Sequence, residues 1–300
     1  MIDSSSLYKT PEGYAAMMAH YDAALEGWSP ESRIVDTRHG KTHVLIDGPE
    51  GLPALFYFHG WGSNATDVRY QINLEALRQH YRVFAPDVIG QFGRSAPTRP
   101  PVNGPAYGEW IADMFDRLDI DQAIVSGISG GGFLSLKIAS YAPQRVTKAF
   151  IISTAGVISL KRMPLKGVVA FLPGIIWPFQ AGGHWIGRWM ARRLLAPSPD
   201  PDQVRDMADF FLEIGRRCKS FGMPGTLTDE ELKAITAPVF CLMGKHDISC
   251  HVDRVINRLR RLVLDFSFEI VPDAGHLLPA QRPDVVRQRM AEFLETGQAV

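Results

Sequence analysis

The sequence predicts an α/β fold, a mostly parallel sheet flanked by helices and interrupted by a helical cap insertion. Short apolar runs of strand length alternate with segments of helical pattern along most of the 300 residues. The alternation stops over residues 157–235 and then resumes. Strands joined by helical crossovers run parallel and are covered on both faces, so the repeated units predict one large sheet.

The predicted strands follow a hairpin in which residues 33–36 and 42–46 flank the turn at His39 and Gly40. Six apolar runs come next, at 54–58, 81–86, 122–127, 147–153, 238–244 and 266–272. The helical patterns between and after them lie at 70–80, 107–118, 130–141, 251–262 and 284–294.

Three parts of the chain are expected from these patterns. Thr10 followed by Pro11 predicts the start of a helix that extends to about Leu25. Its apolar face would consist of Met17, Met18, Tyr21 and Leu25. We therefore expect an N-terminal helical arm over 1–30, an α/β core over 31–156 and 236–300, and a helical cap, or lid, over 157–235.

One part of the predicted cap has the length of a membrane span. No formal charge occurs between Lys166 and Arg188. Pro173, Pro178 and several glycines divide this stretch into short pieces, which favours a lid over a transmembrane helix. Peripheral contact of the cap with a membrane stays open.

Composition argues against several other classes of protein. Lys plus Arg and Asp plus Glu each number 32, so a nucleic-acid partner is not expected. The three cysteines have no metal-like spacing, and Cys241 lies in an apolar run, which suits a reducing, cytoplasmic setting. No histidine pair has the spacing of a metal site on a helix, and the first residues lack a signal-peptide pattern.

The stretch VSGISGGGF carries the first candidate catalytic residue. Ser129 lies among four glycines at a predicted strand-to-helix junction, at the sheet edge where α/β proteins bind ligands. Such a turn presents a serine as a nucleophile, and the amide of Gly130 then becomes one donor of an oxyanion hole. The alternative is a glycine turn in which Ser129 only caps the helix.

A second oxyanion donor is expected from the loop after the third strand, His59-Gly60-Trp61-Gly62-Ser63. In a loop of this type the amide after the first glycine points into the site, which selects Trp61. His59 is expected to brace the turn rather than carry a proton.

A serine nucleophile needs a base and an orienting acid. Asp247 follows the strand at 238–244, and His276 follows the strand at 266–272. The order Ser129, Asp247, His276 is that of α/β hydrolases. His246 and His251 compete for the role of the base and Asp273 for the role of the acid. The remaining histidines, expected at the surface or at helix caps, are His20, His39, His43, His80 and His184.

These motifs make the chain similar to α/β-hydrolase-fold serine hydrolases over residues 31–300. More narrowly it resembles the bacterial carboxylesterase NP branch, named for naproxen ester hydrolysis. The stretches that carry this likeness are TRHGKTHVLIDGPEGLPAL, PDVIGQFGRS, YGEWIADMFDRLDI and LTDEELKAITAPV. PDVIGQFGRS is one residue longer than the common D-x-x-G-x-G-x-S loop. The resemblance implies ester hydrolysis without a cofactor.

The expected function is hydrolysis of small apolar esters through an acyl-enzyme. Alternatives that use the same three residues are a carbon–carbon bond hydrolase, a thioesterase, an acyltransferase and a non-catalytic ligand receptor. The oligomeric state stays open. An apolar pocket for aryl or medium acyl groups is expected from Phe171, Leu172, Ile175, Ile176, Trp177, Phe179 and Trp185.

Overall fold

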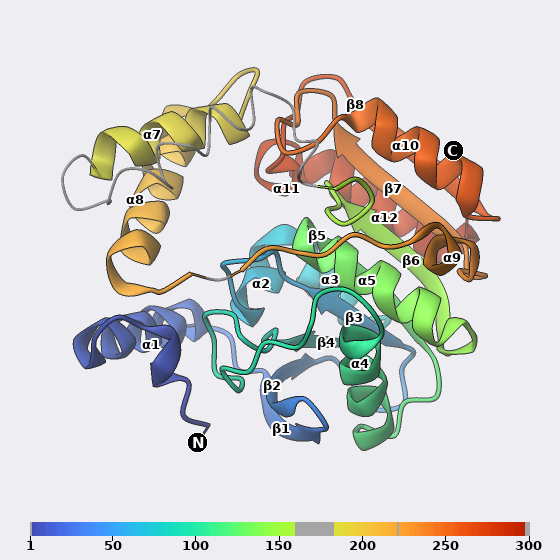
Figure 1. The fold of residues 1–300 in the computed structure, drawn as a ribbon, viewed down its shortest axis with the longest axis horizontal. Coiled ribbons are helices and arrows are strands. Elements are labelled where there is room, and N and C mark those ends of the chain that lie inside the picture. Colours follow the sequence, from blue (N-terminus) through green and yellow to red (C-terminus); the bar gives the residue numbers. More distant parts are fainter. Residues whose placement is uncertain (1, 160–182, 221, 298–300) are drawn as a thin grey trace.

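The computed structural model describes residues 2–159, 183–220 and 222–297. An eight-stranded sheet in the order β1-β2-β4-β3-β5-β6-β7-β8 runs through the described residues (Figure 1). The pairs β1–β2 and β2–β4 are antiparallel and the others are parallel, so the predicted fold class is confirmed. The strands are β1 (Glu31–Thr37), β2 (Gly40–Asp47), β3 (Ala54–Phe58), β4 (Arg82–Pro86), β5 (Ala123–Ile128), β6 (Val146–Ile152), β7 (Val239–Gly244) and β8 (Phe266–Val271).

Helices cover both faces of the sheet and create two apolar clusters. One cluster joins the sheet to α4 (Ala106–Arg117), α5 (Gly130–Tyr141), α9 (Asp229–Lys233) and α10 (Val252–Leu262). The other joins it to α2 (Val68–Gln71), α3 (Leu74–Leu77), α11 (Leu278–Gln281) and α12 (Pro283–Thr296). The two-sided cover explains why the central strands are apolar throughout rather than alternating.

The prediction of one continuous helix over 70–80 is wrong, because the chain forms two short helices there, α2 and α3. Ile72 separates them in an extended conformation, with φ −130° and ψ 167°. Its side chain is buried in the same cluster as Leu74 and Leu77. A continuous helix could not direct Ile72, Leu74 and Leu77 into the core together, so the burial of these side chains overrides the local helical pattern.

The N-terminal arm contacts both the sheet and the helical insertion. In α1 (Pro11–Leu25) the Thr10 hydroxyl accepts a hydrogen bond from the Gly13 amide at 3.0 Å, as the predicted start of the helix requires. Tyr21 is buried in the second core cluster. Ahead of the helix, Tyr8 forms an antiparallel bridge with Cys218, at the end of α8. The arm therefore ties the insertion to the core.

In the described part of the predicted cap, α7 (Gly183–Leu194) and α8 (Pro201–Arg217) pack against each other apart from the helices on the sheet (Figure 1). α9 also lies within the predicted range 157–235 but packs on the sheet, because Leu227, Leu232 and Ile235 are buried in the first core cluster. Trp185 is 68% exposed, so the expectation that it lines an apolar pocket is wrong. No helix among the described residues is long and apolar enough to cross a membrane. The other expected pocket residues lie outside the described ranges: Phe171, Leu172, Ile175, Ile176, Trp177 and Phe179.

Candidate active site

Ser129 lies on a strained turn between β5 and α5. Its φ of 53° and ψ of −112° belong to a conformation that residues with a Cβ seldom adopt. Three backbone hydrogen bonds hold it there: its amide donates to Ile152 O at 2.9 Å, and its carbonyl accepts from Phe133 and Ala155. The Ser129 hydroxyl makes no capping hydrogen bond to α5, which excludes the alternative in which Ser129 only caps the helix. The turn therefore presents a hydroxyl that the helix does not use.

The glycines around Ser129 are required by close backbone approach. A Cβ at Gly131 would lie 1.9 Å from the carbonyl oxygen of Phe58, and one at Gly127 would lie 2.5 Å from the carbonyl carbon of Gly131. Any larger residue would push α5 away from β3 and β5. The tight packing brings the end of β3, and the loop that follows it, beside Ser129.

The loop after β3 places the two expected oxyanion donors together. A Cβ at Gly60 would lie 3.8 Å from the Ser129 Cβ, and the Trp61 indole lies against Gly130. Within the described part of the chain, neither the Trp61 amide nor the Gly130 amide has a hydrogen-bond acceptor. Two unpaired amides beside a serine are the arrangement that stabilises a developing oxyanion.

His59 braces this loop. Its Nε2 accepts a hydrogen bond from the Val88 amide at 3.0 Å, so the ring proton is on Nδ1, which donates to Gly60 O at 2.8 Å. Burial lowers the pKa of His59, more than the nearby carboxylate of Asp87 raises it. Both ring nitrogens are thus occupied by the backbone, as expected of a residue that supports a turn.

Asp247 and His276 follow the adjacent parallel strands β7 and β8, and the fold brings them together. His276 Nδ1 lies 2.8 Å from Asp247 Oδ2, and the Asp247 side chain is completely buried. Burial acts to lower the pKa of His276, but the charge and hydrogen bond of Asp247 outweigh it and raise that pKa. The pair is therefore an imidazole oriented and made more basic by a carboxylate.

Ser249 is a third member of this cluster that the sequence analysis missed. Its amide and hydroxyl donate to Asp247 Oδ1 at 2.7 and 2.6 Å, and its Oγ lies 3.1 Å from His276 Nδ1. A serine two residues after an aspartate often closes a local turn on the carboxylate. The D-x-S pattern was thus a signal that could have identified it.

The hydroxyl of Ser129 and the ring of His276 are not hydrogen bonded to each other among the described residues. Serine–histidine contacts in ligand-free sites are often long and shorten when substrate binds. The backbone amide of His276 donates to Leu194 O at 3.1 Å, so the end of α7 helps to hold the loop that carries the imidazole.

The competing candidates do not join this pair. His246 and Asp273 are exposed, and His251 precedes α10 without a side-chain capping bond. The expectation that His43 lies at the surface is wrong: it is buried, and its Nδ1 lies 3.0 Å from Asp87 Oδ2. A buried carboxylate needs such a partner, and the sequence offered no sign of which histidine supplies it.

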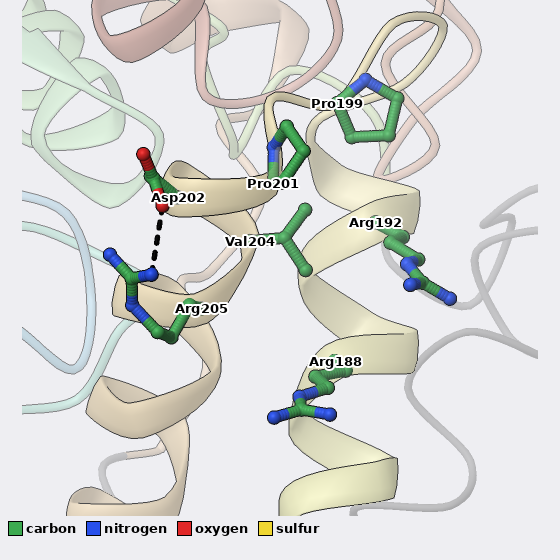
Figure 2. Close-up of a pocket in the computed structure, with 7 residues that line it drawn as sticks. All are labelled: Arg188, Arg192, Pro199, Pro201, Asp202, Val204 and Arg205. Atoms are coloured by element: carbon green, nitrogen blue, oxygen red, sulfur yellow. Dashed lines mark ion pairs between the residues drawn. The ribbon is translucent and has the colours of Figure 1, made fainter.

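A separate hollow of about 320 Å³ lies between α7 and α8 (Figure 2). None of the candidate catalytic residues lines it. Its walls are formed by Arg188, Arg192, Pro199, Pro201, Asp202, Val204 and Arg205. Among the residues that the structure describes, no group of three His, Cys, Asp or Glu side chains has the arrangement of a metal site.

Comparison with known proteins defines the family. A model of the alpha/beta hydrolase family matches residues 55–289, and the chain belongs to that family. It is 30% identical over 306 residues to the carboxylesterase YbfK of Bacillus subtilis, covering 99% of both chains. The crystal structure of that carboxylesterase superposes with a TM-score of 0.78 at 29% identity over 96% of this chain and 99% of that one.

The branch predicted from the sequence is also confirmed. The crystal structure of the B. subtilis naproxen esterase, carboxylesterase NP, superposes with a TM-score of 0.77 at 25% identity, covering 95% of this chain and 99% of that one. The chain is thus a serine hydrolase of the carboxylesterase type, in the naproxen-esterase-like branch of the family.

Proposed function

We propose that this protein hydrolyses small apolar carboxylic esters with Ser129 as nucleophile, His276 as base and Asp247 as orienting acid. The observation that carries the proposal is the 2.8 Å contact between His276 Nδ1 and Asp247 Oδ2 on the loops after neighbouring strands. The carboxylesterase relatives support the reaction class. With Nδ1 engaged by the carboxylate, Nε2 is the nitrogen left to accept a proton.

The first half of the reaction forms an acyl-enzyme. Ser129 Oγ attacks the ester carbonyl carbon and its proton passes to His276 Nε2. The amides of Trp61 and Gly130 hold the oxyanion of the tetrahedral intermediate. The intermediate then collapses, the bond to the alcohol oxygen breaks, and His276 returns the proton to the departing alcohol.

Water completes the reaction. It attacks the acyl carbon while His276 Nε2 takes one of its protons, and the same two amides hold the second oxyanion. Collapse of this intermediate breaks the bond to Ser129, which recovers its proton from His276 as the carboxylic acid is released. Asp247 stabilises the transient imidazolium in both halves.

The site favours an apolar acyl group. The Trp61 ring lies 5.9 Å from the ring of Tyr107 and 6.0 Å from that of Phe133, centroid to centroid, so an aromatic cluster supports the proposed oxyanion loop. A flat aromatic wall beside the reacting carbonyl suits aryl or medium acyl chains. The helices α7 and α8 then act as part of a cap over this site, within a protein proposed to work in the cytoplasm.

The decisive experiment combines fluorophosphonate labelling with turnover of p-nitrophenyl esters of increasing acyl length. Ser129→Ala should abolish labelling and reduce kcat by more than about 10³-fold. Ser126→Ala is the matched control, since Ser126 is a buried serine of β5 whose hydroxyl has no hydrogen-bond partner among the described residues. Retained turnover in Ser129→Ala would refute the proposal.

Thioester, carbon–carbon and acyl-acceptor substrates belong in the same panel. Faster turnover of any of them than of the best ester would assign that reaction instead. Labelling of Ser129 without turnover of any substrate would favour a ligand receptor over an enzyme.

We further propose that the cap touches an anionic lipid surface through one side of α7. That side carries two tryptophans and three arginines at three- and four-residue spacings, whereas the opposite side packs inward. The exposed residues on that side are Trp185, Arg188, Arg192 and Arg193, with Trp189 half-buried among them, and the buried residues of the opposite side are Ile186, Met190, Ala191 and Leu194. The sequence of α7 contains no acidic residue, so the stripe is complementary in charge to anionic headgroups.

Arg188 and Arg192 make no ion pair with the described residues, and both line the hollow in Figure 2. On vesicles of phosphatidylglycerol and phosphatidylcholine, we expect binding that increases with the anionic fraction and decreases with salt. The double substitution Arg188→Gln with Arg192→Gln should weaken it about tenfold or more. Equal binding to pure phosphatidylcholine, or no binding to either vesicle, would rule this contact out.

A further inference from the structure

The turn that presents the Trp61 amide is fastened to the loop after β4. Three hydrogen bonds join them: Val88 N–H donates to His59 Nε2 at 3.0 Å, Gly62 N–H to the Gln91 side-chain oxygen at 2.8 Å, and Ala65 N–H to Asp87 Oδ1 at 2.8 Å. These bonds are spaced along the whole turn. Its conformation therefore depends on the loop after β4.

The direction of the Trp61 N–H is fixed through the carbonyl on the same peptide unit. That carbonyl, Gly60 O, accepts from Ser63 N–H at 3.3 Å and from His59 Nδ1–H at 2.8 Å. In a trans peptide the C=O and the N–H point in opposite directions. Holding Gly60 O on one side of the turn therefore directs the Trp61 N–H to the other side.

The next peptide unit of the turn is held by Gln91 alone among the described side chains. Gly62 has a φ of 83°, the conformation that a type II turn needs at its third position. Its N–H is buried, and the Gln91 side chain that receives it is 2% exposed. A buried amide that loses its acceptor costs about 1–3 kcal/mol, enough for this peptide to rotate toward another partner.

The position of Gln91 is itself fixed by its backbone. Its amide donates to Val88 O at 3.0 Å, and its carbonyl accepts from Gly93 N–H at 3.0 Å. The neighbouring Phe92 packs against Tyr8, with ring centroids 6.0 Å apart. Gln91 lies in the loop that is one residue longer than the common D-x-x-G-x-G-x-S pattern.

We propose that Gln91 is a positioning residue that fixes the Trp61–Gly62 peptide and thereby aims the Trp61 amide at the oxyanion. The proposal rests on the function proposed above. The Gln91 side chain would thus act in catalysis without touching the substrate, because it accepts the hydrogen bond of the buried Gly62 amide.

The test compares Gln91→Leu with Thr66→Val. The first removes the acceptor and keeps similar bulk; the second removes the buried Thr66–Asn64 side-chain bond of 2.7 Å just after the turn and leaves the Trp61–Gly62 peptide alone. We expect Gln91→Leu to lower kcat about 10- to 100-fold with KM within about threefold, because the loss falls on the transition state. Affinity for a trifluoromethyl ketone, which forms the tetrahedral adduct, should fall by the same factor. Thr66→Val should change neither.

Hydrogen exchange of the 60–65 amides tests the structural step without reference to catalysis. Exchange should accelerate in Gln91→Leu and stay slow in Gln91→Glu, which keeps an oxygen acceptor of the same length. Faster exchange with unchanged kcat and ketone affinity would overturn the proposal, and so would unchanged exchange. Failure of fluorophosphonate to label Ser129 in the unsubstituted protein would instead refute the proposed function, so the two failures are distinguishable.

Discussion

The indole of Trp61 lies directly on the Cα of Gly130. A Cβ at position 130 would fall 2.0 Å from Trp61 Cε3, far inside van der Waals contact. The ring is held from behind by Tyr107 and Phe133 and has little freedom to retreat. This contact therefore fixes the distance between the Trp61 and Gly130 amides, which are proposed to form the oxyanion hole.

Gly130→Ala should therefore damage the oxyanion hole by displacing Trp61. We expect kcat to fall about 10²- to 10³-fold, the usual loss when one oxyanion donor is removed. The control is the double variant with Trp61→Ala, which makes room for the added methyl group. If the clash is the cause, the two substitutions will be strongly non-additive in kcat; strict additivity would contradict it.

The pH dependence of kcat/KM should report the opposing influences on His276. The base must be neutral, and Asp247 raises the pKa of His276 although burial lowers it, so activity should rise with pH through this raised pKa. In Asp247→Asn, burial remains as the main influence on the pKa of His276, so the acid limb should move to lower pH. The plateau should also fall, by about 10⁴-fold.

Profiles measured from about pH 5 to 9 would check this, with Asp273→Asn as the control because Asp273 is exposed. An acid limb that stays in place or moves to higher pH in Asp247→Asn would show that His276 is not oriented by Asp247 during turnover.

Ser249→Ala should weaken catalysis without abolishing it. Ser249 donates two hydrogen bonds to Asp247 Oδ1 and leaves Oδ2 for His276. Loss of one hydrogen bond to a charged group costs about 1.5–3 kcal/mol. We expect kcat to fall about tenfold in Ser249→Ala and to be largely kept in Ser249→Thr, both measured with the best p-nitrophenyl ester. Equal losses in the two variants would show that the hydroxyl is not the cause.

The ion pair between Lys137 and Glu231 should be a major determinant of stability. Lys137 is 1% exposed, and its Nζ bonds Glu231 Oε1 and, at 3.0 Å, Gly104 O. Glu231→Gln strands the buried ammonium and should lower the free energy of unfolding by about 3 kcal/mol. Glutamine at this position still allows the capping box with Thr228, so the effect is not a lost helix cap.

Lys137→Met removes the buried charge together with its need for a partner and should cost less than Glu231→Gln. Urea unfolding of both variants gives the comparison. A larger loss in Lys137→Met would mean that the lysine contributes mainly through its packing against Phe133, 5.6 Å from its Nζ.

The elements that were predicted well are those whose signals are local. The Gly130–Tyr141 helix begins where glycines permit a close turn, and α1 begins at Thr10 because a hydroxyl there caps the free amides. The helix that was predicted wrongly, a single one over 70–80, lies where the local pattern was helical but the demand for burial at Ile72 came from the distant core.

The sequence by itself determined the order of strands and helices and the loops that carry Ser129, Asp247 and His276, because apolar periodicity and turn chemistry act over a few residues. Only the tertiary structure decided which distant groups meet: Ser249 with the Asp247–His276 pair, Gln91 with Gly62, and Tyr8 with Cys218. The physical reason is that a hydrogen bond or bridge between segments far apart in the chain depends on how the whole sheet and its helices pack, and neither partner carries a local sign of the other.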